Sequence, residues 1–473
     1  MLEAEPEREA AISQPDQIVP LLARVAGRHG LPPVALAAMI ADWLRRPGST
    51  PPAEALLDRK AADFLALVQR LAEAIGDPEV QRLRQEAAAA LNAGNFADAD
   101  KALAQAELHA IGGVTDLSTL PIERRLLIGE NRADRGALSF LRTTAEGYRE
   151  ASARYGEAST LIGLADVERS RAMALEQAKA LARISEDFGG RDGYDAAIAA
   201  LRRLLEGLDR LADTVAFAGA QEALAATLEG LAALTGETKL LTAALVHCRS
   251  GIEYLSRDEA PPLWRMLSLR IGRIAVTLGV TQKDDELLEE AIATYASVLS
   301  AWDRADDEPR WLEAEHMISR ARATLGRRRS DLSLLERAFN GLNRVSLATE
   351  RAREPLRWAE LQDQMGNVLA AMGERYSEPV VIEEAIAAFA AALQERRQDS
   401  VPLLWARSLA NQAEAMLQLA RRNKDKELAQ KALTQLMTAT ETARRSSGGD
   451  SLAADLQKRL VAAGAMATKL IGG

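Results

Sequence analysis

Four segments of the chain begin with tryptophan and share a pattern of small and apolar residues: WRMLSLRIGRIAVTLG (264–279), WLEAEHMISRARATLG (311–326), WAELQDQMGNVLAAMG (358–373) and WARSLANQAEAMLQLA (405–420). Their tryptophans are spaced 47 residues apart. One further step in each direction reaches Phe217 and Leu452. Self-similarity at a fixed spacing of this length is typical of a repeat array.

Three columns of small residues keep the same 47-residue step. One column holds only alanine, and the other two hold glycine, alanine or serine. Small residues at a fixed register let two helices approach closely. The columns are Ala197, Ala244, Ala291, Ala338, Ala385 and Ala432; Ala178, Ala225, Gly272, Ser319, Gly366 and Ala413; and Ser185, Ala232, Gly279, Gly326, Gly373, Ala420 and Ala467.

Composition excludes several classes of protein. The 473 residues are 48% hydrophobic but only 4% aromatic, so alanine and leucine, both good helix formers, supply the apolar side chains. A net charge of −9 with both signs interspersed argues against nucleic-acid binding, which needs a basic surface. The single cysteine, Cys248, excludes an internal disulfide. We find no signal peptide and no membrane-spanning run, and expect a cytoplasmic protein.

Helix-breaking residues divide the chain. We predict an N-terminal tail with two short helices, 17–30 and 33–46, in a segment 1–52 that ends in the linker PGSTPP (47–52). Degenerate helical hairpins follow over 53–185, and one long helix is predicted from Ala158 to Asp187. The 47-residue repeats occupy 186–446. The last segment, 447–473, is predicted to be a capping helix that covers the final apolar face.

Residues 94–106 carry a family resemblance. Gly94, Ala99, Leu103 and Ala106 match the second half of a tetratricopeptide repeat in type and spacing. The 47-residue units fit the same pattern if both helices are about one turn longer than standard. The chain thus resembles the tetratricopeptide superfamily over roughly residues 78–470. The resemblance implies an all-α, right-handed solenoid of helical hairpins, a concave groove lined by first helices, protein or peptide binding, and usually no catalysis.

Residues that could carry chemistry do not converge on a pattern. His247 and Cys248 are adjacent, so their side chains diverge on a helix, and we interpret them as a buried thiol beside a surface imidazole. Gly189–Gly193 is glycine-rich but joins two helices, unlike a phosphate-binding loop. We therefore predict no enzyme activity, no metal and no cofactor.

The tryptophans at unit spacing have two interpretations. They could form a ladder on which a ligand stacks, but each begins an apolar helical stripe, so we favour packing between successive hairpins. Trp302 lies outside the column near a helix end and is predicted to be a surface aromatic.

The partner-binding residues are predicted on the first helix of each hairpin, on the face that does not carry the tryptophan and its apolar stripe. The resemblance implies groove-facing positions two, five, six and nine residues after each tryptophan. A solvated polar face without a partner is the alternative. The predicted groove comprises Arg270, Arg273, Glu313, His316, Arg320, Glu360, Asp363, Gln364, Asn367, Arg407, Asn411 and Glu414.

Three classes of function remain open. The first is a protein-interaction scaffold or adaptor that binds a peptide or helix, with self-association possible. The second is a regulatory subunit of a signalling or defence system whose segment 1–52 docks an effector. A separable, folded segment 1–52 would favour it. The third is an enzyme with a site in 53–185, which a cleft gathering carboxylates with His109 or His29 would favour.

Overall fold

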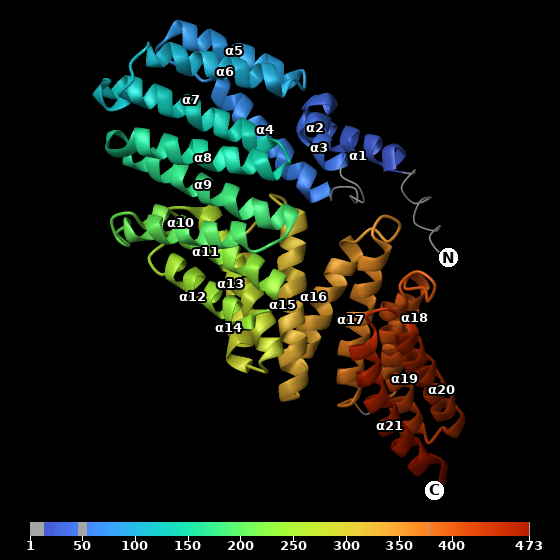
Figure 1. The fold of residues 1–473 in the computed structure, drawn as a ribbon. Helices are drawn as coiled ribbons and strands as arrows, with labels where there is room; N and C mark the ends of the chain where they lie inside the picture. The colour runs from blue at the N-terminus through green and yellow to red at the C-terminus, as the bar shows by residue number, and fades with distance from the viewer. Residues whose placement is uncertain (1–13, 46–53, 377, 473) are drawn as a thin grey trace. The chain divides into compact units, whose positions relative to one another are not determined.

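The computed structural model describes residues 14–45, 54–376 and 378–472. Regular structure in these ranges consists of α-helices and two 3-10 turns, without a strand. Consecutive helices pack against one another (Figure 1), as predicted for an all-α solenoid. The predicted linker 47–52 lies outside the described residues.

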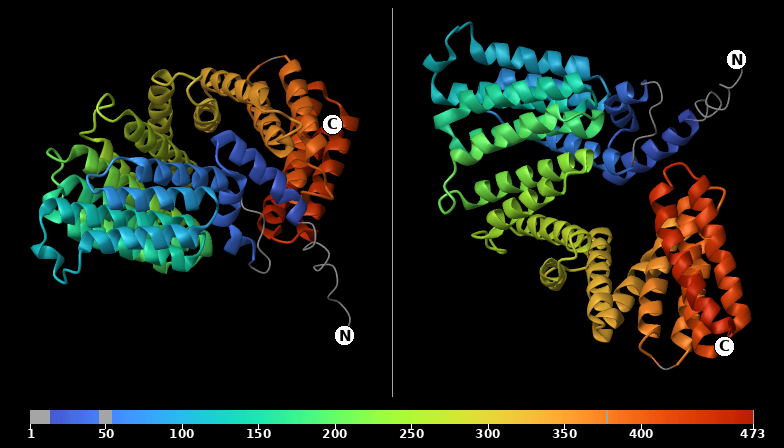
Figure 2. Two further views of the ribbon diagram at one scale, coloured as in Figure 1. Left: turned by 90° about the horizontal axis from the view of Figure 1, so that it is seen from above. Right: turned by 60° about the horizontal axis from the view of Figure 1, so that its bottom comes forward.

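The chain divides into two compact units, Met1–Trp264 and Arg265–Gly473. The division falls inside the predicted 186–446 array, and the boundaries predicted at 52, 185 and 446 stay predictions. In the first unit, helices pair in chain order after α4, as Figure 2 also shows. Its helices are α1 (Gln14–His29), α2 (Pro33–Met39), α3 (Ala41–Leu44), α4 (Glu54–Ala72), α5 (Pro78–Asn92), α6 (Phe96–Ile111), α7 (Ile122–Leu141), α8 (Ala145–Ile162), α9 (Val167–Phe188), α10 (Asp192–Glu206), α11 (Thr214–Thr235) and α12 (Thr238–Ile252), with 3-10 turns at Leu117–Thr119 and Gly163–Ala165.

The N-terminal helices belong to the core of the first unit. Val25, Leu36 and Met39 are buried in one apolar cluster with residues of α4 to α9. Thr143, at the end of α7, donates from its amide and its hydroxyl to the carbonyl of Met39, at 3.1 and 2.8 Å. Helices α1 and α2 therefore pack with the hairpins.

The single helix predicted from Ala158 to Asp187 is wrong. Helix α8 continues to Ile162, and α9 begins at Val167. Gly163 has a φ of 39°, a conformation that glycine adopts easily. Asp166 then accepts a hydrogen bond from the amide of Arg169 and caps α9. The glycine and the cap together end one helix and begin another within a helix-favouring sequence.

The second unit repeats one hairpin. Its first helices begin at Pro261, Glu308, Pro355 and Pro402, which are successive steps of 47 residues. Asp284, Asp331 and Asp425 each cap a second helix through its free amides. The helices are α13 (Pro261–Thr281, in this unit from Arg265 onward), α14 (Asp285–Ser300), α15 (Glu308–Arg329), α16 (Leu332–Ala348), α17 (Pro355–Gly373), α18 (Val380–Glu395), α19 (Pro402–Asn423), α20 (Lys426–Arg445) and α21 (Asp450–Gly472).

The small-residue columns lie where the two helices of a hairpin meet. The alanines from Ala197 to Ala432 are all completely buried. A Cβ built on Gly272 would lie 2.5 Å from the ring of Tyr295, and one on Gly366 would lie 2.7 Å from the ring of Phe389. Glycine is therefore required where the second helix presents an aromatic ring.

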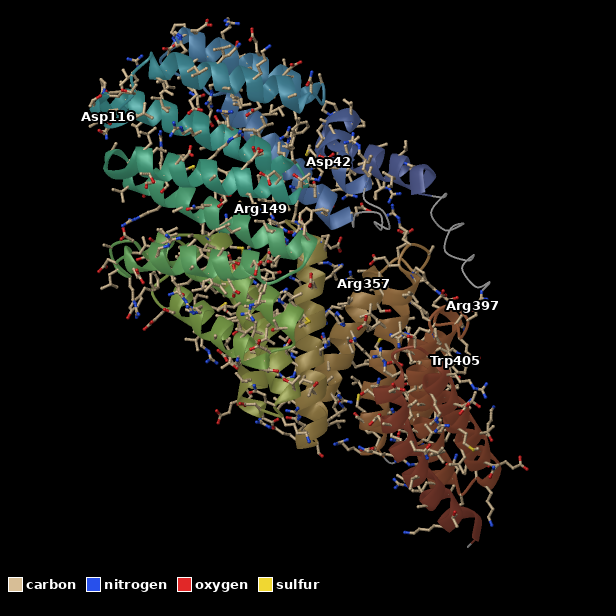
Figure 3. The ribbon with its side chains drawn as sticks, in the orientation of Figure 1. Asp42, Asp116, Arg149, Arg357, Arg397 and Trp405 are labelled. Carbon is tan, nitrogen blue, oxygen red and sulfur yellow. The ribbon has the colours of Figure 1, made fainter. Side chains whose placement is uncertain are left out.

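The four tryptophans at the 47-residue spacing are half-buried. On three of them, and on the equivalent Phe217, an arginine seven residues earlier in the chain stacks against the ring. Cation–π stacking of this kind adds to packing at a partly exposed ring. Gln398 interrupts the pattern before Trp405, which is labelled in Figure 3. The stacked pairs, with guanidinium-to-centroid distances, are Arg210–Phe217 (5.6 Å), Arg257–Trp264 (6.0 Å), Arg304–Trp311 (5.4 Å) and Arg351–Trp358 (4.3 Å).

Trp302 is not the surface aromatic that its position predicts. It is 6% exposed, and the guanidinium of Arg265 lies 4.4 Å from its ring centroid. The residue lies just after α14, which ends at Ser300, and the stacked Arg265 comes from α13.

The C-terminal helix α21 caps the array as predicted. Leu456, Ala463 and Ala467 join the apolar cluster of α19 and α20. Helix α21 packs against both of these helices. It covers the apolar face that the last hairpin leaves open.

Substituting Ala338 by leucine should destabilise the second unit by about 1–3 kcal/mol, because the site is completely buried and has no room for added methylenes. A thermal melt of the full chain would measure the effect. Ala387→Leu, at an exposed position of α18, is the control and should leave the melt nearly unchanged. An unchanged melt for Ala338→Leu would contradict the close helix contact.

Removing the ring of Trp358 should lower stability by about 3 kcal/mol, the low end for loss of a buried aromatic, because this ring is half-buried. Arg351→Gln should cost less, about 1 kcal/mol, because it removes the stacked cation and keeps the ring. Urea denaturation would measure both. A Trp358→Ala protein of parental stability that fails to bind a partner would indicate a ligand ladder instead.

Candidate functional site

The predicted groove residues lie on the first helices α13, α15, α17 and α19 of the second unit. We call these twelve residues the first-helix face. Exposure divides them into three groups. Arg273, Glu313, Arg320, Glu360 and Arg407 are exposed; Arg270, His316, Gln364, Asn367, Asn411 and Glu414 are half-buried; and Asp363 is buried.

Hydrogen bonds join this face from one first helix to the next. Nε2 of His316 on α15 lies 2.8 Å from Oε1 of Gln364 on α17. The amide of Asn411 on α19 lies 3.4 Å from both carboxylate oxygens of Asp363 on α17. Both contacts join the residue five positions after one tryptophan to the residue six positions after the next. The polar positions of α15, α17 and α19 therefore adjoin in register.

His316 is held in its neutral form. Burial lowers its pKa, and the hydrogen bond that Nε2 donates to Oε1 of Gln364 opposes the shift only in part. The Gln364 amide also donates to Glu360, at 3.0 Å. Because the ordinary pKa of histidine already lies below 7, the imidazole is uncharged at neutral pH. His316 thus supplies a hydrogen-bonding ring rather than a charge.

The sequence predicts Asp363 as a groove residue, but the structure shows that it is buried and not accessible to a partner. The residue is 5% exposed, and its carboxylate accepts a 2.7 Å hydrogen bond from the hydroxyl of Ser408. That hydroxyl accepts a 2.8 Å bond from Nη1 of Arg396, which lies 3.6 Å from the carboxylate. Arg396 is 1% exposed, and burial lowers its pKa. Asp363 faces inward because it neutralises this buried arginine.

The last first-helix positions are tied to the capping helix. Arg459 on α21 donates to Glu414 at 2.5 Å and to Asn411 at 3.0 Å. Asn411 therefore bonds on both sides, to Asp363 and to Arg459. These contacts hold α17, α19 and α21 together along their polar positions.

The exposed members of the face are all charged. Glu313, Glu360 and Arg407 lie two positions after a tryptophan, and Arg273 and Arg320 lie nine positions after one. The two rows therefore present carboxylates and guanidinium groups to solvent. Charged groups of both signs favour a polar or charged peptide surface through charge-assisted hydrogen bonds.

A column of arginines was missed by the sequence analysis. Arg328 donates to the carbonyl of Gly279 at 3.1 Å, Arg375 to that of Ser330 at 3.4 Å, and Arg422 to that of Gly373 at 2.7 Å. Each guanidinium thus caps the carboxyl end of the preceding first helix. The signal was present, because the three arginines also follow the 47-residue step.

One cleft of the first unit gathers carboxylates around a histidine. It has a volume of about 880 Å³ and is lined by His109, Asp77, Glu123 and Glu130 among others. Nε2 of His109 lies 3.3 Å from Asp77. Asp77 also accepts from the amides of Glu79 and Val80 as the cap of α5, and these bonds lower its pKa. The carboxylate therefore has a structural role in addition to its contact with His109.

Two other polar groups have interior roles. Lys60 is 3% exposed, donates to the carbonyl of Phe140 at 2.7 Å, and lies over the rings of Phe140 and Tyr148. Burial lowers its pKa to about 8, and Asp63 and Asp187 oppose the shift. Cys248 is completely buried, as predicted. His247 beside it is half-buried rather than a surface imidazole, and its Nδ1 lies 2.7 Å from Oε1 of Gln221.

The described ranges have neither a metal-binding cluster nor a membrane-spanning helix. They contain no group of three or more histidine, cysteine or carboxylate side chains placed to hold a metal ion. No helix in them is long and apolar enough to cross a membrane.

Comparison with known proteins gives little further information. No protein-family model and no curated protein matches the chain. Among solved structures, 26 chains match, including a "Circular tandem repeat protein with novel repeat topology and enhanced subunit contact surfaces". That protein is 15% identical, and the match covers 96% of this chain and 97% of that one, with a TM-score of 0.23. A likeness this low carries no argument about function.

Replacing Asp363 by alanine should cost about 3–5 kcal/mol of stability, because Arg396 would remain buried without a counter-charge. The loss would be measured by urea denaturation of the full chain, from the unfolding transition of the second unit. Glu360→Ala, an exposed carboxylate on the same helix, is the control and should change stability by less than about 1 kcal/mol. Parental stability in Asp363→Ala would contradict the structural role.

Proposed function

We propose that this chain is a non-catalytic protein-interaction scaffold, built as a tetratricopeptide-like array with a 47-residue period. A peptide or helix of a partner protein binds along the first-helix face. The observation that carries the proposal is the register of polar contacts, His316–Gln364 and Asp363–Asn411, between successive first helices. A face joined in this way presents the same helix positions repeatedly, which suits an extended or helical ligand.

The charges of the face suggest the chemistry of the partner. Arg273 and Arg320 are exposed and occupy equivalent positions in consecutive 47-residue repeats. Arginine binds carboxylates through paired hydrogen bonds. The partner segment therefore carries acidic residues where it meets α13 and α15. We place this interaction in the cytoplasm, as expected from the sequence.

The regulatory-subunit alternative has less support. It depends on a segment 1–52 that stands apart and can dock an effector. The described part of this segment instead contributes Val25, Leu36 and Met39 to the core of the first unit. An effector would have to bind the outer surface of these helices.

The enzyme alternative rests on the cleft around His109 and Asp77. The cleft meets the criterion of a histidine gathered with carboxylates. Its lining residues include no serine, threonine, cysteine or lysine that could act as a nucleophile. Asp77 is also occupied in capping α5. Scaffolding remains the better-supported function.

Charge reversal tests the scaffold proposal. The variant Arg273→Glu with Arg320→Glu should keep its helicity and lose partner binding, most clearly at low salt, because the sites are exposed and the lost complementarity is electrostatic. The full chain serves as bait to identify the partner, and binding of the purified partner is then measured by calorimetry.

The control makes the same charge change on second helices, with Arg337→Glu and Lys431→Glu, which are also exposed. It should bind like the parent. Equal binding by the parent and the first-helix variant at low ionic strength would refute the proposed face.

A further inference from the structure

Helices α7, α8, α9 and α10 of the first unit line an open cleft of about 830 Å³. The segment before α7 contributes Ser118 to the lining, and Asp116 of the same segment is labelled on the left of Figure 3. A cleft that crosses four consecutive helices and opens to solvent suits an extended chain better than an enclosed small molecule.

Three arginines line the cleft: Arg125 and Arg132 from α7, and Arg203 from α10. Glu157 is the only carboxylate in the lining. Arg132 is already neutralised, because its Nε donates to Glu107 at 2.6 Å and its Nη1 lies 3.7 Å from Glu157. The lining therefore carries more positive than negative charge.

The other two arginines are not neutralised. Neither Arg125 nor Arg203 forms an ion pair with any residue that the structure describes. Nε of Arg125 is buried and makes no hydrogen bond there. A buried donor without an acceptor is costly, and a bound acceptor would satisfy it. Arg203 is exposed, and among the described residues its hydrogen bonding is limited to a long contact, 3.4 Å, with the carbonyl of Ala199 in its own helix.

The remainder of the wall is apolar or neutral. Leu161 and Leu204 supply apolar surface, and the amide of Gln177 is a neutral hydrogen-bonding group. The hydroxyl of Ser118 is engaged by Asp116, at 2.7 Å. The cleft thus combines an apolar strip with two guanidinium groups that have no counter-charge in the described part of the chain.

We propose that this cleft is a second docking site, which binds a peptide segment carrying carboxylate side chains next to apolar ones. The carboxylates pair with Arg125 and Arg203, and the apolar side chains lie against Leu161 and Leu204. The site is separate from the first-helix face and does not depend on it. A chain with both sites binds two segments, of one partner or of two.

Two peptide libraries test the site. One has the form Ac-X-Glu-X-X-Glu-X-amide, with X drawn from Ala, Val, Leu, Ile and Phe, and the other has glutamine in place of glutamate. The full-length chain is immobilised, and the retained peptide is quantified at low and high salt. The parent should retain the glutamate library about tenfold better at low salt and lose this preference at high salt.

The variant Arg125→Gln with Arg203→Gln should lose the preference for glutamate. Arg202→Gln is the matched control, because Arg202 is exposed on the same helix but does not line the cleft. It should behave like the parent, and circular dichroism verifies that all variants fold. The site is refuted if the parent shows no preference, or if the double variant retains it.

The same measurement on Arg273→Glu with Arg320→Glu separates the two proposals. A preference that survives this variant but not Arg125→Gln with Arg203→Gln belongs to the cleft. A preference lost only with the first-helix variant belongs to the other face and refutes the cleft.

Discussion

The close contact between the two helices of each hairpin is the constraint on which the rest of the structure depends. Alanines at one register are completely buried, and Gly272 and Gly366 leave room for the rings of Tyr295 and Phe389. In the repeat between them, Ser319 stands in place of the glycine and the smaller Leu342 stands in place of the aromatic ring. Packing at interior density allows no added volume at these points. The size of each residue is therefore matched to its neighbour across the hairpin.

Repeating this contact places successive first helices side by side and brings their polar residues together. Some of those residues then stabilise the stack and are less available to a partner. Asp363 is committed to Arg396 and Ser408, and Asn411 links Asp363 to Arg459. Arg320 and Glu360 stay exposed, and in the proposed function such charges contact the partner. The proposed scaffold therefore uses different positions of the same helical surface for stability and for binding.

Arginine has several distinct roles in this chain. It stacks on the aromatic residue at the start of four successive repeats, as Arg351 does on Trp358, and it caps the preceding first helix, as Arg422 does. Its planar, permanently charged guanidinium suits both tasks. Arg125 and Arg203 differ because neither has a carboxylate partner among the described residues. That difference separates a structural arginine from a candidate for recognition.

The sequence by itself determined the helical hairpins, the buried small-residue columns and the capping helix, because periodic spacing reports which residues share a helix face. It also contained the arginine columns, although periodicity alone does not say what a guanidinium contacts. Only the tertiary structure decided that Asp363 faces inward, that Trp302 is buried and that α8 ends at Ile162. Each of these depends on a partner distant in sequence or on local backbone geometry: Arg396 for Asp363, Arg265 for Trp302, and the positive φ of Gly163 for α8. The cleft between α7 and α10 is likewise a product of tertiary packing, since its arginines come from two hairpins.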